Sequence, residues 1–345
     1  LVEVTPDGLN KVFYSDSGAT AVEIGMKMAL QYFSNREGKP SKKNRFLTFE
    51  NGYHGDTFGP MSVVPDPQFH WPFESLLPDP VQMPFPHESG DPQRDDEILA
   101  DSERTLRDLL EDHEDELAGV MLEPVQGAGG MVVPPRGFLR MVREVTAEYD
   151  LFMVVDEVAT GVGRTGSIFA CAAEGVTPDI MMLGKGITGG YLPVAATLAT
   201  QEIFDAFLGT RKQGLLHGHS YTGNALGCAA ALASLDLLED TLDRLPEKCS
   251  LIQKELQGFP ESEAIKQIRQ RGFMVGIEMD PDSVQIPEDS RGVGWAVCEE
   301  AQRRGMLLRP LGPVVVFMPP LSSTSQELRE MINILRRSVR SVVGD

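Results

Sequence analysis

Cysteine and long apolar runs are both scarce in this sequence of 345 residues. The four cysteines are scattered and include no CxxC pair, at Cys171, Cys228, Cys249 and Cys298. This spacing excludes a disulfide framework or a cysteine zinc site, and it predicts reduced thiols in a cytoplasmic protein. No apolar run reaches about 18 residues, the length that predicts a membrane-spanning helix.

Positive charge is also scarce. Lys and Arg number 31 against 51 Asp and Glu, which gives a formal net charge of −20. Such a surface repels phosphate backbones, so we expect no nucleic-acid partner. The first ten residues, LVEVTPDGLN, have neither the basic start nor the apolar stretch of a signal peptide. They do not begin with Met, and we expect an N-terminal segment to be missing before Leu1.

The apolar pattern predicts two domains. Continuous apolar runs predict strands at 45–50, 118–125, 151–158, 179–185 and 192–200. Helical spacing of apolar residues predicts helices at 19–33, 96–117 and 137–150. Strands separated by helices indicate an α/β fold whose mostly parallel sheet is covered on both faces. Because single cores rarely grow past about 250–300 residues, we expect a large domain at 1–245 and a small α+β domain at 246–345.

Charged residues stand at two predicted strand ends. Asp156 ends LFMVV, and Lys185 ends DIMML within the glycine-rich stretch MMLGKGITGG. Ligands of open parallel sheets bind at the carboxyl ends of strands, so we expect both side chains in one crevice. The lysine is a candidate Schiff-base nucleophile, and the aspartate is a candidate partner for a pyridinium nitrogen. The turn SDSG at 15–18 opens a helix and predicts a phosphate cradle.

Each of these features also has an ordinary structural interpretation. A lysine after a strand is often a solvated surface residue, and an aspartate there often caps the next helix. GKGITGG is not a Walker loop, because no glycine stands five residues before GK and no Ser or Thr follows the lysine. HGH at 217–219 could be a metal-binding pair of imidazoles. No carboxylate cluster accompanies it, and His54 with Asp56 is no stronger, so we expect no metal site.

An ordered set of motifs favours the catalytic interpretation. The motifs are SDSGATAVE, NGYHGDTFG, LEPVQGAGGM, VVDEVATGVGRTG, PDIMMLGKGITGG and HGHSYTGNALGCAAA. The set covers nearly the whole chain and resembles the class III aminotransferases of fold type I. The resemblance implies pyridoxal 5′-phosphate as cofactor, a homodimer, and transfer of an amine from a small-molecule donor to a keto acid.

The resemblance also implies roles around the cofactor ring. Lys185 would bind the cofactor covalently and then carry the proton that moves during transfer. Asp156 would keep the pyridine nitrogen protonated, with Glu123 supporting the site beside it. Val158 and Tyr53 would pack on the two faces of the ring.

Further implied contacts are made to phosphate and to substrate. Ser17 and Gly18 would hold the phosphate through hydroxyl and backbone N–H groups. Ser220, with His219, would reach the phosphate of the partner subunit's site. The residues implied to contact substrate are Tyr53, Arg164, Lys185, Gly218 and Arg309. Among these, Arg309 would grip the keto-acid carboxylate with two parallel hydrogen bonds.

Within the family, one branch fits the sequence best. Ala159 stands in DEVATGVGRTG, where the GABA and ornithine branches typically carry Gln. NGYHGDTFGPMSV and RPLGPVVVFMPPL also resemble this branch. The implied reaction passes an amine from S-adenosylmethionine to 8-amino-7-oxononanoate and yields 7,8-diaminononanoate, in biotin biosynthesis.

Several departures from the family pattern leave two alternatives open. Ala19 replaces the usual Ser or Thr, Val162 replaces a common Phe, and HGHSYTGN differs from HGPTFMGN. We also expect the family's N-terminal region, which supplies a substrate-facing Trp and Tyr, to be absent. The alternatives are another class III ω-aminotransferase of the ornithine, GABA or diamine type, and a truncated cofactor-binding protein without turnover.

Overall fold

The computed structural model describes residues 1–64, 70–77, 80–285 and 290–344. The chain divides into two compact units. The first comprises Leu1–Pro124, Pro134–Val162 and Ile168–Leu237, and the second comprises Val125–Val133, Gly163–Ser167 and Leu238–Asp345.

We keep the division at 245/246 as a proposal. The compact units differ from it in two loops and in 238–245, which belongs to the second unit. Segments 125–133 and 163–167 belong to the second unit because they are hydrogen-bonded to its sheet. Arg269 donates to the carbonyl of Gly130 at 2.8 Å, and the Phe273 amide donates to the carbonyl of Arg164 at 2.9 Å. A single boundary in the sequence cannot describe a chain that enters the second unit twice before position 238.

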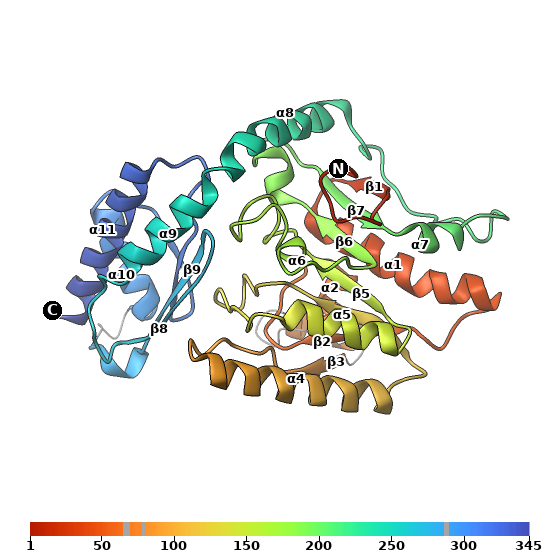
Figure 1. Cartoon of the computed structure of the whole chain (residues 1–345), viewed down its shortest axis with the longest axis horizontal. Coiled ribbons are helices and arrows are strands. Elements are labelled where there is room, and N and C mark those ends of the chain that lie inside the picture. Colours follow the sequence, from red (N-terminus) through yellow and green to blue (C-terminus); the bar gives the residue numbers. More distant parts are fainter. Residues whose placement is uncertain (65–69, 78–79, 286–289, 345) are drawn as a thin grey trace. The chain divides into compact units, whose positions relative to one another are not determined.

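The first unit is built on a seven-stranded sheet with the order β1-β7-β6-β5-β4-β2-β3 (Figure 1). Its strands are β1 (Lys11–Ser15), β2 (Arg45–Phe49), β3 (Val81–Met83), β4 (Leu117–Leu122), β5 (Phe152–Asp156), β6 (Ile180–Leu183) and β7 (Ala195–Ala199). The five strands from β3 to β6 in this order pair in parallel. The predicted α/β fold with a mostly parallel sheet is confirmed.

β7 is the exception, because it pairs antiparallel with both β6 and β1. A parallel crossover needs about a dozen residues or more and usually contains a helix. The connection from β6 to β7 covers only 184–194 and contains the single 3₁₀ turn η2 (Lys185–Thr188). The chain therefore turns back immediately after β6, and Lys185 lies at the start of this turn.

Helices cover the sheet of the first unit. They are α1 (Gly18–Glu37), α2 (Phe58–Val63), the 3₁₀ helix η1 (Trp71–Leu76), α4 (Pro92–Asp112), α5 (Phe138–Glu148), α6 (Ala170–Ala173), α7 (Gln201–Asp205) and α8 (Ala225–Leu242). α1 packs directly on β6 and β7. A Cβ at Gly25 would come within 3.0 Å of the Met182 sulfur, so glycine permits this close approach of helix to sheet.

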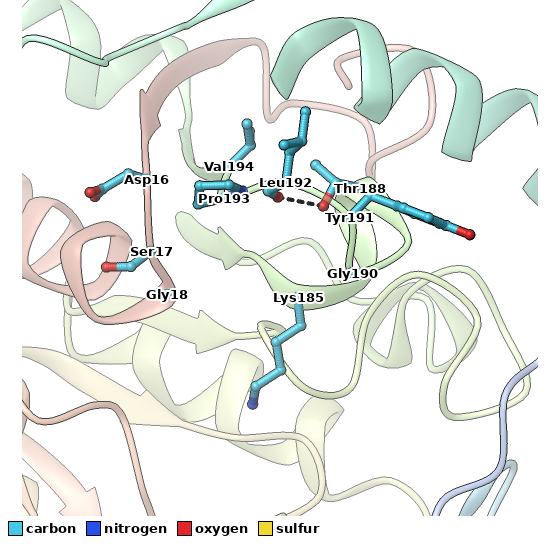
Figure 2. Close-up of a pocket in the computed structure, with 10 residues that line it drawn as sticks. All are labelled: Asp16, Ser17, Gly18, Lys185, Thr188, Gly190, Tyr191, Leu192, Pro193 and Val194. Carbon is cyan, nitrogen blue, oxygen red and sulfur yellow. Dashed lines mark hydrogen bonds between the residues drawn. The ribbon is translucent and has the colours of Figure 1, made fainter. Parts of the chain in front are cut away.

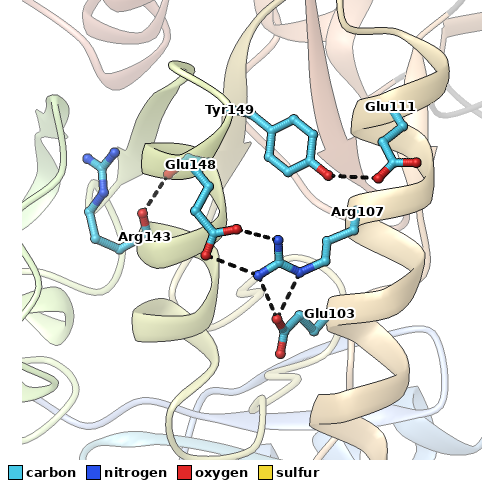
Figure 3. A network of polar contacts seen from close by, with 7 residues as sticks. Glu103, Arg107, Glu111, Arg143, Glu148 and Tyr149 are labelled. Atoms are coloured by element: carbon cyan, nitrogen blue, oxygen red, sulfur yellow. Dashed lines mark hydrogen bonds and ion pairs between the residues drawn. The ribbon is translucent and has the colours of Figure 1, made fainter.

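An ion-pair network joins α4 to α5 (Figure 3). Arg107 pairs with Glu103 on its own helix at 2.8 Å and with Glu148 at the end of α5 at 2.6 Å. The guanidinium holds the pKa of Glu148 below its ordinary value. The Tyr149 hydroxyl donates to Glu111 at 3.1 Å. Part of the acidic surface of α4 therefore fastens this helix to its neighbour.

The second unit is a small α+β structure, as predicted. Its antiparallel sheet has the order β10-β11-β9-β8. The elements are α9 (Leu245–Leu256), β8 (Ile265–Arg271), β9 (Met274–Met279), the 3₁₀ turn η3 (Pro281–Ser283), α10 (Val293–Arg303), β10 (Arg309–Leu311), β11 (Val314–Phe317) and α11 (Ser325–Val343). α11 begins with a capping box formed by Thr324 and Glu327. Across the described parts of both units, no helix combines the length and apolarity needed to cross a membrane.

Candidate active site

Asp156 ends β5 at the carboxyl edge of the parallel strands and is only 5% exposed. Its Oδ1 accepts a hydrogen bond from the Val158 amide at 3.0 Å. Its Oδ2 lies 2.8 Å from Nδ1 of His54, which is also 5% exposed. An ionised carboxylate only accepts hydrogen bonds, so the Nδ1–H of His54 is the donor. The two contacts fix the orientation of the carboxylate at the strand end.

His54 was not predicted as a site residue; it was considered only as a possible metal ligand. Burial alone favours the neutral ring, but the hydrogen bond and charge of Asp156, with the charge of Glu123, outweigh it and raise the pKa of His54. The available sequence signal was the place of His54 inside the motif NGYHGDTFG.

Tyr53 is held at both its backbone and its side chain. Its amide donates to Oε1 of Glu123 at 2.9 Å, and its hydroxyl donates to Asp56 at 2.9 Å. Burial and the Asp56 hydrogen bond raise the pKa of Tyr53 to about 12, so the phenol stays neutral near pH 7. Its side chain remains 41% exposed. Glu123 thus acts on the site through the backbone of the 53–56 turn.

The N-terminus of α1 lies where the sequence predicts an anion cradle. Ser17 is the N-cap, and its hydroxyl accepts from the Thr20 amide at 3.2 Å. The Thr20 hydroxyl lies 2.8 Å from that of Ser17, so a second hydroxyl stands one turn into the helix despite the Ala19 departure. A Cβ at Gly55 would come within 2.5 Å of the Ala19 Cβ, so the 53–56 turn packs directly against this helix start.

The cradle and Lys185 share one cavity of about 290 Å³ (Figure 2). Its lining residues are Asp16, Ser17, Gly18, Lys185, Thr188, Gly190, Tyr191, Leu192, Pro193 and Val194. The Thr188 hydroxyl donates to the Leu192 carbonyl at 2.6 Å and closes the turn behind Lys185. Figure 2 shows the Lys185 side chain extending away from Tyr191.

Lys185 follows β6 directly and has a left-handed backbone, with φ +38°. Asp156 pairs in register with Met182, so the aspartate and the lysine stand at the ends of neighbouring strands. Val158 fills the space between two glycines. A Cβ at Gly18 would come within 2.7 Å of its Cγ1, and one at Gly184 within 3.2 Å. The missing side chains therefore bring the start of α1, the end of β5 and the start of η2 close together.

The other predicted residues are not among those that line this cavity. His219 Nε2 lies 3.4 Å from Asp16 beside the cradle, whereas Ser220 and Gly218 are exposed. Arg164 and Arg309 belong to the second unit. Arg164 donates to the Pro319 carbonyl at 2.7 Å, and burial lowers its pKa. Arg309 begins β10 and is exposed. Among the described residues, no group of three or more His, Cys, Asp or Glu side chains is placed to hold a metal.

The fold is that of a known class of enzyme. The family model of the class III aminotransferases matches residues 1–339 of the chain. The chain therefore belongs to the class III aminotransferases, which confirms the resemblance derived from the motifs.

The most similar relatives that we compared carry the name of one particular enzyme. The chain is 48% identical to the adenosylmethionine-8-amino-7-oxononanoate aminotransferase of Geobacter sulfurreducens, and the match covers 100% of this chain and 78% of that protein. The enzyme of the same name from Aquifex aeolicus is 45% identical, over 99% of this chain and 77% of that protein.

Solved structures of aminotransferases have the same fold as this chain. The crystal structure of the enzyme of that name from Methanocaldococcus jannaschii has a TM-score of 0.89 at 40% identity, covering 99% of this chain and 77% of that one. An amine transaminase from an uncultivated Pseudomonas species, in a PLP-bound form, has a TM-score of 0.85 at 32% identity, covering 96% and 77%.

Proposed function

We propose that this chain is a pyridoxal-phosphate-dependent aminotransferase that passes an amine from S-adenosylmethionine to 8-amino-7-oxononanoate, in biotin biosynthesis. The printed names of its 48% and 45% identical relatives support both the reaction and its substrates. The structural observation that carries the proposal is the pair of neighbouring strand ends. β5 delivers a buried, oriented aspartate, and β6 delivers a lysine into a cavity that opens on a helix N-terminus.

The residues present fit the cofactor. The start of α1 offers uncompensated backbone N–H groups and a positive helix end to a phosphate, at Ser17 and Gly18. Asp156, oriented by two contacts, would accept the N–H of a pyridinium ring. Val158, packed against glycines that leave room for a flat ring, would cover one face, and Tyr53 the other. When bound, pyridoxal phosphate supplies an electron sink for the carbon that carries the amine.

The chain's own groups then handle the proton and the substrate. The Nζ of Lys185 would bind the cofactor and carry the proton between donor carbon and cofactor. Asp156 would hold a proton on the ring nitrogen, and His54 keeps that carboxylate oriented. Arg309 would bind the keto-acid carboxylate, with Arg164 and the backbone of Gly218 as further polar contacts. These substrate roles follow from the family resemblance.

A homodimer is part of the proposal. Within 225–237, α8 is apolar apart from Ser234 and Asp236, and Leu226, Leu232 and Leu237 are 75%, 65% and 72% exposed. A helix of this kind is ordinarily buried. Tyr221, on the segment that leads into α8, is 71% exposed. We propose that a second copy covers this surface, that His219 and Ser220 complete its phosphate site, and that the dimer is cytoplasmic.

The test is a coupled assay on the purified protein with pyridoxal phosphate. With S-adenosylmethionine and 8-amino-7-oxononanoate, we expect 7,8-diaminononanoate, measured by mass spectrometry. Activity with alanine or GABA but not with S-adenosylmethionine would assign the chain to another class III ω-aminotransferase. Bound cofactor that no donor converts to its amine form would identify a binding protein without turnover.

A further inference from the structure

A stripe of polar side chains runs along α1 on the side away from its buried face. Glu23, Lys27, Gln31 and Asn35 are spaced by four residues, which places them on one side of the helix. Spacing of this kind usually marks a solvated face. Here each of the four side chains instead contacts another segment of the chain: Glu23 the first turn of α2, and the other three the segment that follows α7. Glu23, nearest the helix start, accepts from the Gly59 amide at 2.8 Å.

The two amides of the stripe hold the segment between α7 and α8. Asn35 Nδ2 donates to the carbonyls of Ala206 at 3.1 Å and Gln213 at 2.9 Å. Gln31 Nε2 donates to the carbonyls of Gln213 at 3.1 Å and Gly214 at 3.2 Å. Figure 1 shows α7 and the start of this segment beside α1. Irregular backbone must find partners outside regular secondary structure, and these two half-buried side chains provide them.

A third contact lies next to the residues that the dimer would use. Lys27 Nζ lies 3.0 Å from Nδ1 of His217. Burial and the nearby Lys27 charge lower the pKa of His217, so the ring stays neutral and its Nδ1 accepts from the ammonium. The ring also meets Phe13 edge to face, with centroids 6.4 Å apart. The chain is thus fastened immediately before Gly218, His219 and Ser220.

We propose that Gln31 and Asn35 are positioning residues for the active site of the partner subunit. They hold segment 206–217, which delivers His219 and Ser220 to the partner's phosphate, while the N-terminus of the same helix cradles the phosphate of its own site. One helix would therefore serve two active sites. This inference rests on the homodimer of the proposed function.

Two substitutions that nearly preserve side-chain shape remove the hydrogen bonds from Gln31 and Asn35 to segment 206–217. Asn35→Asp and Gln31→Glu replace donor N–H groups by carboxylate oxygens that face carbonyl oxygens. We expect each to weaken pyridoxal phosphate binding about tenfold, with turnover largely restored by excess cofactor. Gln302→Glu on α10 is the control, because it makes the same charge change at an exposed position and should leave cofactor affinity unchanged.

Mixed dimers separate an effect on the partner's site from an effect on the chain's own site. In a dimer of one Lys185→Ala subunit and one Asn35→Asp subunit, the lysine-bearing site receives an unmodified segment. We expect wild-type cofactor affinity at that site. In a dimer of a wild-type subunit and a Lys185→Ala/Asn35→Asp subunit, the lysine-bearing site receives the altered segment. There we expect the tenfold weakening. Two affinity tags isolate each mixed dimer.

The reverse order of affinities, or equal affinities in the two mixed dimers, would overturn the inference. The same comparison made with Ser220→Ala in place of Asn35→Asp tests the shared site on its own. If Ser220→Ala acts on the partner and Asn35→Asp does not, only the positioning role fails. If the wild-type dimer lacks transamination, or Ser220→Ala acts within its own chain, the proposed function or its shared site fails first.

Discussion

His54 donates through Nδ1 to Oδ2 of Asp156 across 2.8 Å, and both residues are buried. The two lie 102 positions apart in the chain. The pair joins the motif that carries Tyr53 to the strand end that would face the pyridine nitrogen. We therefore expect a change in the charge of the His54 ring or of the Asp156 carboxylate to alter both the activity of the site and the free energy of unfolding.

The first prediction concerns pH. The pKa of His54 is raised in the folded state above its ordinary 6.5, so the protonated ring is stabilised by folding. This contribution is complete below about pH 6.5 and is lost as pH rises through the raised value, at about 1.4 kcal/mol for each unit between the two pKa values. Urea unfolding of the apoprotein between pH 5 and 9 measures it.

We expect His54→Gln to flatten that pH dependence. His113→Gln, at the end of α4, is the control and should keep the wild-type slope. A wild-type slope in the His54 variant would show that another group carries the pH dependence.

Asp156→Asn is expected to lower turnover by about 10²- to 10⁴-fold, because a neutral amide does not keep a pyridine nitrogen protonated. His54 would lose its charged partner at the same time, so the stability slope above should also change. Steady-state kinetics measures the first effect. Asp96→Asn on the exposed side of α4 makes the same chemical change and should be silent. Undiminished turnover in the Asp156 variant would remove this residue from the mechanism.

Lys185→Ala is expected to abolish turnover and the visible absorbance of covalently held cofactor. The cradle at Ser17 and Gly18 is untouched, so some reversible binding of pyridoxal phosphate should remain, detectable by dialysis. Lys254→Ala, exposed on α9, should keep both absorbance and activity. Retention of the absorbance in the Lys185 variant would contradict the assignment.

Gly55→Ala should destabilise the site by more than ordinary backbone strain. Gly55 has φ +122°, and an added Cβ would stand 2.5 Å from the Cβ of Ala19 and 2.9 Å from its Cα. We expect the start of α1 to be pushed from the 53–56 turn, with weaker cofactor binding. In Gly38→Ala, with φ +68° and no atom within 4 Å of the new Cβ, only the strain remains, about 1–2 kcal/mol. Equal losses of stability in the two variants would exclude the clash.

The sequence sufficed to place Asp156 and Lys185 together, because parallel strands end at the same edge of a sheet. It predicted the cradle for a similar local reason, since SDSG opens a helix. It did not identify His54 as the partner of Asp156, because nothing local to either residue encodes a contact across 102 positions. The reversal at β7 was also missed, since an apolar run has the same pattern in either direction.

The contacts of the polar stripe on α1 could not be predicted from the sequence for another reason. Glu23, Lys27, Gln31 and Asn35 have the composition of a solvated face, and only the fold reveals that the segment after α7 lies against them. The loops at 125–133 and 163–167 were placed in the large domain because position along the chain says nothing of a return to a distant sheet.

At Lys185 the residue that the proposed chemistry requires differs from the residue that the backbone conformation favours. At φ +38° a side chain with a Cβ is strained by about 1–2 kcal/mol, and glycine is not. Replacing the lysine by glycine should therefore give an apoprotein that is more stable and inactive. Fold stability alone would therefore favour glycine at position 185, and the strained lysine fits the catalytic role proposed for it.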